Sequence, residues 1–235
     1  ETRTYGHIVV DEAQDLSPMQ LRMLARRSLS GSMTVVGDIA QATGVWAHKD
    51  WDEILENLPN RRPAQRAELS IGYRIPGPTM DLAAKVLAVA APDLRPPNSV
   101  RQTGDEPRII SVGASAGAGE LAARVAAVAA EERDAVDPGS VAVIAPDTLV
   151  EDVVAALEAA DIEFGRASRT GLESRVTLVP VSLVKGLELD AAVVVEPAAI
   201  VDEQAQGLRA LYVALTRATK RLAIVHARDL PGPLR

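Results

Sequence analysis

Short apolar runs alternate with longer segments of helical periodicity along most of the chain. Runs such as Ile8–Val10 and Val141–Ala145 are continuous in apolar residues, which is typical of strands buried on both faces. The segments between such runs carry apolar residues three or four positions apart, and the dipeptide Ser17-Pro18 marks a helix start. Because strands alternate with helices, the pattern predicts an α/β fold of parallel βαβ units with helices on both faces.

The boundaries of the expected elements follow from the same pattern. Strands are expected at residues 8–10, 33–36, 67–71, 108–112, 141–145, 176–179, 192–195 and 223–226. Helices are expected from Pro18 to about Ser28, at 50–58, from Pro76 or Pro78 to about Ala90, and at 119–133, 149–160 and 206–217. Residues 91–106 are rich in proline and polar residues and predict a loop. Residues 61–67 are interpreted as a connector, after which the pattern restarts.

Composition narrows the class of protein. The 235 residues are 47% hydrophobic and 24% charged, which is ordinary for a globular α/β protein. The absence of cysteine excludes disulfides and thiolate metal sites, and three scattered histidines argue against structural zinc. No basic-then-apolar leader and no membrane-spanning run is found, so a cytoplasmic location without a membrane partner is expected. The net charge of −7 argues against a free-standing nucleic-acid binder.

Two adjacent carboxylates follow the first predicted strand, in the run Ile8-Val9-Val10-Asp11-Glu12-Ala13-Gln14-Asp15. Ligands bind at the carboxyl ends of strands in open α/β sheets. A carboxylate pair at such a place can hold Mg²⁺, usually through water, and can take a proton from an attacking water. Asp-Glu alone is more often an ordinary polar turn, but the longer run favours a site.

Four further runs carry polar residues that suit a nucleotide site. A glutamine amide can contact a γ-phosphate and the attacking water, a tyrosine can stack on adenine, and an arginine can bind phosphate oxygens in bidentate fashion. The runs are Val36-Gly37-Asp38-Ile39-Ala40-Gln41, Leu69-Ser70-Ile71-Gly72-Tyr73-Arg74, Val184-Lys185-Gly186-Leu187-Glu188-Leu189-Asp190 and Leu211-Tyr212-Val213-Ala214-Leu215-Thr216-Arg217. Each short run alone also occurs as an ordinary turn or surface pair.

Together and in this order, the five runs resemble motifs II to VI of superfamily 1 helicases typified by UvrD, Rep and PcrA. The resemblance implies ATP and Mg²⁺ as cofactors and an ATP hydrolase. It implies that Asp11 is the magnesium ligand, Glu12 the general base, and Asp15 a coupling residue. Further nucleotide contacts are implied for Gln41, Tyr73, Arg74, Glu188 at the ribose, and Arg217 as a second arginine finger.

The resemblance also implies a domain organisation. Residues 1–66 are expected to be the C-terminal part of a first RecA-like domain and 67–235 a near-complete second one, with ATP between them. No run reads G-x-x-x-x-G-K-[ST], the phosphate-binding loop of P-loop NTPases, so that loop is expected upstream of Glu1. The 235-residue chain alone is therefore expected to hydrolyse ATP negligibly.

Departures from the helicase pattern leave the function open between three hypotheses. Gly44 stands where relatives carry a base-stacking tyrosine, and Ser182 stands where DNA-tracking relatives carry histidine. With these, the chain most resembles HelD-type ATPases, which implies bacterial RNA polymerase as a partner and its release from nucleic acid. The first alternative is a UvrD-type DNA helicase or translocase, with Trp46 either stacking on DNA bases or buried in the core. The second is a non-catalytic RecA-like interaction module.

Overall fold

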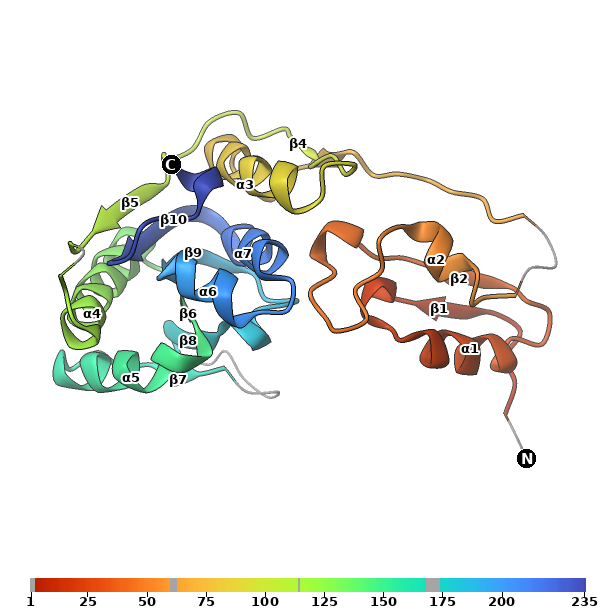
Figure 1. Ribbon diagram of the computed structural model, residues 1–235, viewed down its shortest axis with the longest axis horizontal. Helices are drawn as coiled ribbons and strands as arrows, with labels where there is room; N and C mark the ends of the chain where they lie inside the picture. Colours follow the sequence, from red (N-terminus) through yellow and green to blue (C-terminus); the bar gives the residue numbers. More distant parts are fainter. Residues whose placement is uncertain (1–2, 60–62, 114, 168–173) are drawn as a thin grey trace. The chain divides into compact units, whose positions relative to one another are not determined.

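The computed structural model describes residues 3–59, 63–113, 115–167 and 174–235, and the chain divides into two compact units. Unit 1 comprises residues 1–68 and unit 2 residues 69–235. Each unit is described by itself below, and Figure 1 labels its elements. The expected connector of residues 61–67 has no regular secondary structure from 63 to 67, while Arg61 and Arg62 lie outside the described residues.

Unit 1 is a parallel two-stranded sheet with short helices. Its elements are β1 (Ile8–Val10), α1 (Pro18–Arg27), β2 (Met33–Val35) and α2 (Trp51–Leu55), with single turns of 3₁₀ helix at Ala13–Asp15 and Ile39–Gln41. Ser17 caps α1 in a capping box with Gln20, and Pro18 occupies the first turn, as the sequence predicts.

The expectation that both strands of unit 1 are buried is wrong. Val9 is 69% exposed and Val36 is 44% exposed, although Val10 is buried. Two described strands are too few to have both faces covered by helices, so one set of alternating side chains stays at the surface.

Unit 2 is built on a six-stranded parallel sheet in the order β5-β10-β9-β6-β8-β7. The strands are β5 (Arg108–Ser111), β6 (Val141–Ala145), β7 (Gly165–Arg166), β8 (Val176–Pro180), β9 (Leu189–Val195) and β10 (Ala218–His226). Every strand pair that the structure describes is parallel, which confirms the expected α/β class. A separate short pair, β3 (Ile71–Gly72) with β4 (Asn98–Ser99), precedes the sheet in the chain.

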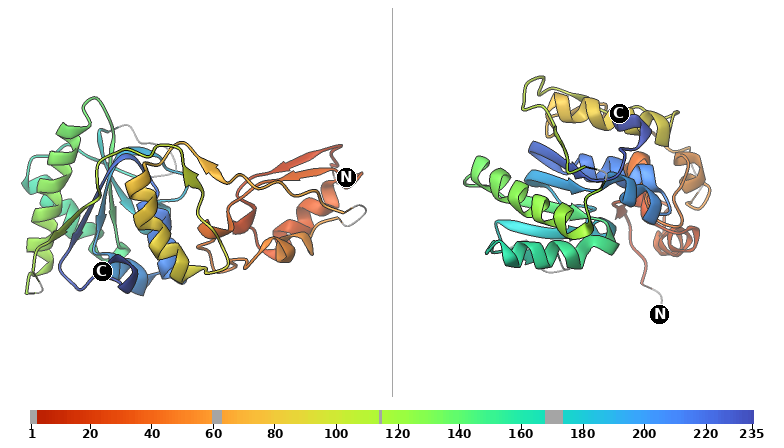
Figure 2. Two further views of the ribbon diagram at one scale, coloured as in Figure 1. Left: turned by 90° about the horizontal axis from the view of Figure 1, so that it is seen from above. Right: turned by 60° about the vertical axis from the view of Figure 1, so that its left-hand side comes forward.

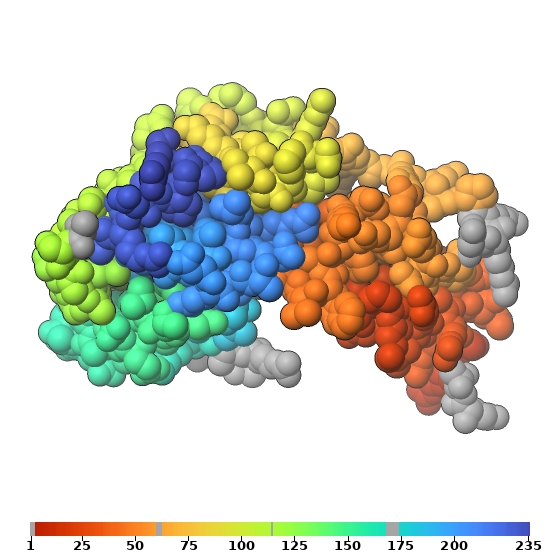
Figure 3. Space-filling view, viewed as in Figure 1, coloured from red at the N-terminus to blue at the C-terminus, as the bar shows by residue number. Residues whose placement is uncertain are grey.

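Helices cover both faces of this sheet, so unit 2 has three layers (Figure 2, right). On one side lie α4 (Ala118–Ala135) and α5 (Val150–Ala159). On the other lie α3 (Gly77–Ala90), α6 (Pro197–Glu203) and α7 (Gly207–Leu215). Atoms of α6 and α7, in light blue, lie in the middle of the near surface of unit 2 in Figure 3. Short 3₁₀ turns occur at Asp147–Leu149, Val181–Leu183 and Gly232–Leu234.

The alternation of side chains along the central strands forms a core on each face of the sheet. Val141, Val143 and Ala145 pack with α4 and α5, as do Val193 and Val195 on the neighbouring strand. The residues between them are equally buried, so β6 and β9 are apolar on both faces. This explains why these strands are continuous apolar runs in the sequence.

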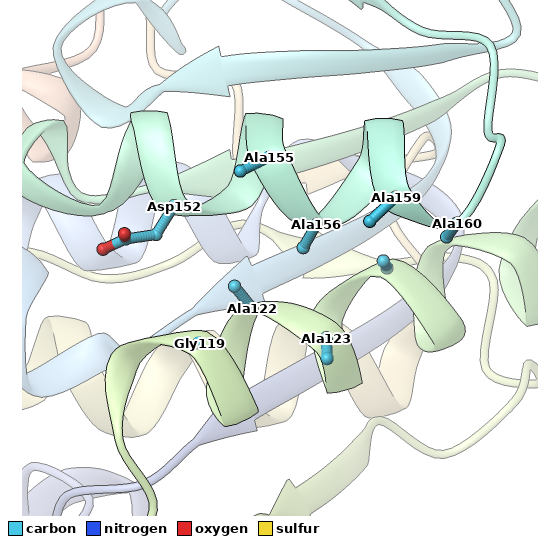
Figure 4. A pocket seen from close by; sticks show the side chains of 9 residues that line it. Gly119, Ala122, Ala123, Asp152, Ala155, Ala156, Ala159 and Ala160 are labelled. Atoms are coloured by element: carbon cyan, nitrogen blue, oxygen red, sulfur yellow. The ribbon is translucent and has the colours of Figure 1, made fainter.

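A hollow of about 400 Å³ lies between α4 and α5. Figure 4 shows that it is lined almost entirely by alanines, with Gly119 and Asp152 at one end. The small side chains allow the two helices to pack closely but present only one charged group. None of the predicted site residues lines it.

Candidate nucleotide site

In unit 1, the predicted site residues follow two neighbouring parallel strands. Asp11 and Glu12 follow β1, and Asp38 and Gln41 follow β2, whose register pairs Val10 with Val35. Because the strands are parallel, both loops leave the sheet at the same edge. Asp11 and Glu12 are exposed there, and the Glu12 amide donates to Asp11 Oδ1 at 2.8 Å.

The two loops are joined by the buried side chain of Gln14. Its Nε2 donates to Glu12 Oε2, and its Oε1 accepts from the backbone amide of Asp38 at 3.0 Å. Asp38 in turn accepts from the Ala40 amide at 2.9 Å and from Gln41 Nε2 at 2.8 Å. The predicted base Glu12 and the predicted phosphate contact Gln41 are thus fixed by one chain of hydrogen bonds.

The sequence analysis gave this coupling role to Asp15 and none to Gln14. Within unit 1 the link between the two motifs runs through Gln14, which is fully buried. A role for Asp15 stays a prediction. Glutamine in the run Asp-Glu-x-Gln-Asp was visible, but its partner Asp38 is 24 residues away, and sequence spacing alone does not reveal that contact.

Gly37 is required for the close approach of Gln14. A Cβ atom at this position would lie 2.3 Å from Gln14 Oε1 and 3.1 Å from the Ala13 amide nitrogen. Gly37→Ala is therefore expected to displace Gln14 and to destabilise unit 1 by about 1–3 kcal/mol. The measurement is urea unfolding followed by tryptophan fluorescence, because Trp46 and Trp51 both lie in unit 1.

The matched control is Gly44→Ala. A Cβ atom at Gly44 would meet nothing within 4 Å, so the unfolding midpoint should stay unchanged. Equal midpoints for the Gly37 and Gly44 variants would contradict the proposed role of the Gln14 contact.

In unit 2, the predicted residues Arg74 and Glu188 are in direct contact, although 114 residues separate them in the sequence. Arg74 Nη1 and Glu188 Oε1 form an ion pair, with side chains 44% and 48% exposed. Tyr73, the predicted adenine-stacking residue, is 79% exposed beside it. Arg74 and Glu188 therefore lie together where they can meet a ligand, and the exposed Tyr73 is adjacent to Arg74 in the chain.

Arg217, the predicted second arginine finger, is buried next to this pair. Its Nε donates to Val213 O at 3.0 Å and its Nη1 donates to Leu187 O at 3.3 Å. Its own carbonyl accepts from the Leu189 amide at 3.2 Å. Arg217 thus holds the residues on both sides of Glu188. The finger role of Arg217 stays a prediction.

The start of β9 is fixed by Asp190, the acidic residue that ends the fourth run. Its carboxylate accepts from the Ser140 amide at 2.9 Å and pairs with Lys220 Nζ at 2.9 Å. Burial raises the pKa of Asp190, but the hydrogen bonds from Lys220 and Ser140 outweigh it and hold the pKa below its usual value of 3.8. The strand that begins directly after Glu188 is therefore anchored by an ionised side chain at neutral pH.

Two positions near the departures from the helicase pattern, Trp46 and Ser182, lie in the part of the chain that the structure describes. Trp46 is 61% exposed, which contradicts the interpretation that it belongs to the core. Ser182 Oγ donates to Asp147 Oδ1 at 3.0 Å, so a carboxylate occupies the edge where DNA-tracking relatives carry histidine. Among the described residues, no group of three metal-ligating side chains exists, and no helix is long and apolar enough to cross a membrane.

Comparisons with known proteins bear on the family and the fold. Residues 175–225, which contain Glu188 and Arg217, match the family model described as the UvrD-like helicase C-terminal domain. A similar solved structure is the C-terminal domain of a possible DNA helicase from Lactobacillus plantarum WCFS1, at 22% identity and a TM-score of 0.50. The similarity covers 69% of this chain and 92% of that one. The parallel sheet flanked by helices is thus similar in fold to that helicase C-terminal domain.

These findings bear differently on the three hypotheses. No curated protein matches the chain. The family match favours the UvrD-type helicase, the first alternative of the sequence analysis, over the HelD-type interpretation. The structural similarity, at 22% identity, supports the fold alone.

Proposed function

We propose that this chain is the C-terminal motor portion of a UvrD-like superfamily 1 ATPase, which uses Mg²⁺-bound ATP to drive a helicase-type motion. The observation that carries the proposal is the joining of Arg74, Glu188 and Arg217, predicted independently from three motifs, in one hydrogen-bonded group. Arg74 and Glu188 are accessible and Arg217 lies buried behind them, and such convergence of distant charged residues is typical of a functional site.

The residues present suit the cofactors that this function requires. Mg²⁺ usually keeps several waters and is held by one or two carboxylates together with the substrate phosphates. Asp11 and its neighbour Glu12 can provide the carboxylates. When bound, Mg²⁺ neutralises charge that develops on the phosphates. Glu12 would accept the proton of the attacking water, with its carboxylate oriented by Gln14.

The exposed side chains of unit 2 suit the nucleotide. Tyr73 would stack on the base and Glu188 would accept a hydrogen bond from the ribose. Arg74, whose present partner is a solvent-exposed carboxylate, can exchange it for a phosphate at small cost. Guanidinium groups placed on the transferred phosphoryl group supply much of the catalysis in such enzymes.

A HelD-type factor that releases bacterial RNA polymerase from nucleic acid is the second candidate. It is favoured by the Ser182–Asp147 hydrogen bond, because a carboxylate at this edge repels a DNA backbone. Gly44 also favours the HelD-type factor, since it has no side chain to stack on a base. Both departures weaken a grip on DNA without touching the predicted ATP contacts.

The deciding experiment measures ATP turnover by the full-length protein alone, with single-stranded DNA, and with bacterial RNA polymerase. Strong stimulation by DNA supports the UvrD-type motor. Turnover that ignores DNA, with polymerase retained through purification, supports the HelD-type factor. Absence of turnover under all three conditions overturns both and leaves a non-catalytic interaction module.

Trp46 provides a sharper test of DNA contact. If the UvrD-type proposal holds, Trp46→Ala should raise the DNA concentration that gives half-maximal stimulation about tenfold, since a base–aromatic stack contributes about 1–3 kcal/mol. Met19→Ala is the matched control, because Met19 is 71% exposed on α1 of the same unit. An unchanged DNA dependence in the Trp46 variant would argue against base stacking there.

A further inference from the structure

The loop that carries Tyr73 and Arg74 makes few backbone contacts of its own. It connects β3 to α3, and residues 73–76 belong to neither element. Backbone carbonyls outside a ladder or helix need other partners when water is excluded. In this loop the partners come from β4 and the residues that follow it, which run alongside β3 (Figure 1).

Two side chains of that segment hold successive carbonyls of the loop. Ser99 Oγ donates to Ile75 O at 2.6 Å, and Arg101 Nη1 donates to Arg74 O at 2.7 Å. The backbone of the segment adds a third bond, because the Gly77 amide donates to Arg101 O at 2.7 Å. The conformation of Arg74 is therefore imposed by residues about 25 positions further along the chain.

Arg101 also connects this loop to the central sheet. The same Nη1 donates to Thr219 O in β10 at 2.5 Å. Thr219 lies within the register shift between Ala218 and Arg221, where the pairing of β10 with β9 is interrupted. Its hydroxyl donates to Leu189 O at 3.2 Å, next to Glu188.

These contacts close into a ring. Arg74 pairs with Glu188 through its side chain, Glu188 precedes Leu189, Leu189 O bonds Thr219, and Thr219 O returns through Arg101 to Arg74 O. Arg101 bonds both the Arg74 loop and β10 through one side chain. Loss of Arg101 would open the ring while leaving the Arg74 side chain intact.

We propose that Arg101 is a positioning residue that sets the location of Arg74 for phosphate contact. The inference rests on the proposed ATPase function and adds a residue that none of the five motifs contains. Arginine suits this role because its planar guanidinium holds two acceptors in a fixed geometry, whereas lysine presents a point charge on a flexible stem. Displacement of a catalytic group by about 1 Å can cost about a hundredfold in rate.

The test uses the full-length protein. Arg101→Met should lower kcat for ATP hydrolysis about tenfold to a hundredfold and change KM for ATP less than kcat, since it misplaces a group that acts on the transition state. Arg101→Lys should recover part of the loss. In an Arg74→Ala background, Arg101→Met should cause no further loss, because its effect passes through Arg74. Arg95→Met, at an exposed arginine of the same connection, should match the unaltered protein.

Other outcomes would overturn either the positioning role of Arg101 alone or the proposed function as well. Additive losses in the double variant, or an Arg101→Met enzyme with unaltered kcat, overturn the positioning role while the proposed function stands. An unaltered protein without ATP turnover overturns the proposed function and this inference together. If Arg101→Met does not fold, as judged by circular dichroism, Arg101→Gln replaces it with the same expectation, because one amide can still donate to a single carbonyl.

Discussion

Replacement of Arg74 by alanine is expected to lower ATP turnover of the full-length protein about a thousandfold. An arginine that stabilises the transferred phosphoryl group contributes about 10³ to 10⁵ in rate, and a thousandfold loss corresponds to about 4 kcal/mol of transition-state stabilisation. The free energy of unfolding should change little. The Arg74–Glu188 ion pair is about half exposed, and such pairs contribute about 0–1 kcal/mol to stability. Steady-state ATP hydrolysis and urea unfolding of the same samples measure both quantities.

Arg166→Ala is the matched control for Arg74→Ala. Arg166 is also a half-exposed arginine of unit 2, paired with Glu151 at 3.0 Å, and no motif contains it. Its removal should leave turnover and stability unchanged within about twofold and 1 kcal/mol. Equal losses of turnover in the two variants would indicate a general effect of surface charge, and would contradict the phosphate contact of Arg74.

The strands and helices that sequence analysis predicted best are those with unbroken apolar patterns. β6 begins and ends at the predicted residues, and α4 extends the predicted helix by one residue at the start and two at the end. β9 and β10 begin earlier than expected, because Asp190 and the run Thr219-Lys220-Arg221 are polar and were assigned to loops. The short edge strand β7 and the seven-residue helix α6 were missed, since neither is long enough to show a period.

Strand β3 illustrates a different limit. The sequence predicts a strand at residues 67–71, but β3 covers only Ile71–Gly72. Its extent is set by its partner β4, which was expected to be a loop and has two residues. Strand boundaries depend on the pairing partner, and the composition of the strand alone does not contain that information.

The candidate site also contains residues that sequence could identify and residues that it could not. The motif residues Arg74 and Glu188 could be named from sequence, and their contact in unit 2 is new information from the fold. Gln14 and Arg101 could not be assigned roles, because each acts on backbone groups of distant segments. Arg101 bonds Thr219 across 118 residues, and no residue type or spacing signals a side chain that binds a carbonyl.

An ionic network around the buried Glu132 of unit 2 was also absent from the sequence analysis. Glu132 of α4 is 1% exposed and accepts from Arg108 of β5 and from Arg221 of β10, each at 2.6 Å. Hydrogen bonds to Glu131 and Glu132 raise the pKa of Arg108, and the hydrogen bond to Glu132 raises the pKa of Arg221. Glu132 therefore joins a covering helix to two adjacent strands at a point where a lone charge would be very unfavourable.

Glu132→Ala is expected to destabilise unit 2 by about 3 kcal/mol. Removing one partner from a buried ion pair costs about 3–5 kcal/mol, and the lower end applies because Arg108 and Arg221 are partly exposed and keep Glu131 and Asp105 as partners. Urea unfolding of the 235-residue chain followed by far-ultraviolet circular dichroism measures the loss. Tryptophan fluorescence, which reports unit 1, should show an unchanged midpoint.

Comparison with Glu131→Ala distinguishes the effect of burial from the effect of charge, because Glu131 and Glu132 both bind Arg108 but differ in exposure. Glu131 binds Arg108 at 2.6 Å but is 43% exposed, so Glu131→Ala should cost about 1 kcal/mol or less. The hydrogen bond from Arg108 holds the pKa of Glu131 below its usual 4.5, so its contribution is present above that pH and disappears as the pH falls through the lowered value. Unfolding curves of Glu131→Ala and the unaltered chain should therefore differ slightly at pH 7 and converge in acid. If Glu131→Ala proves as costly as Glu132→Ala at pH 7, burial of the Glu132 carboxylate is not what makes this network stabilising.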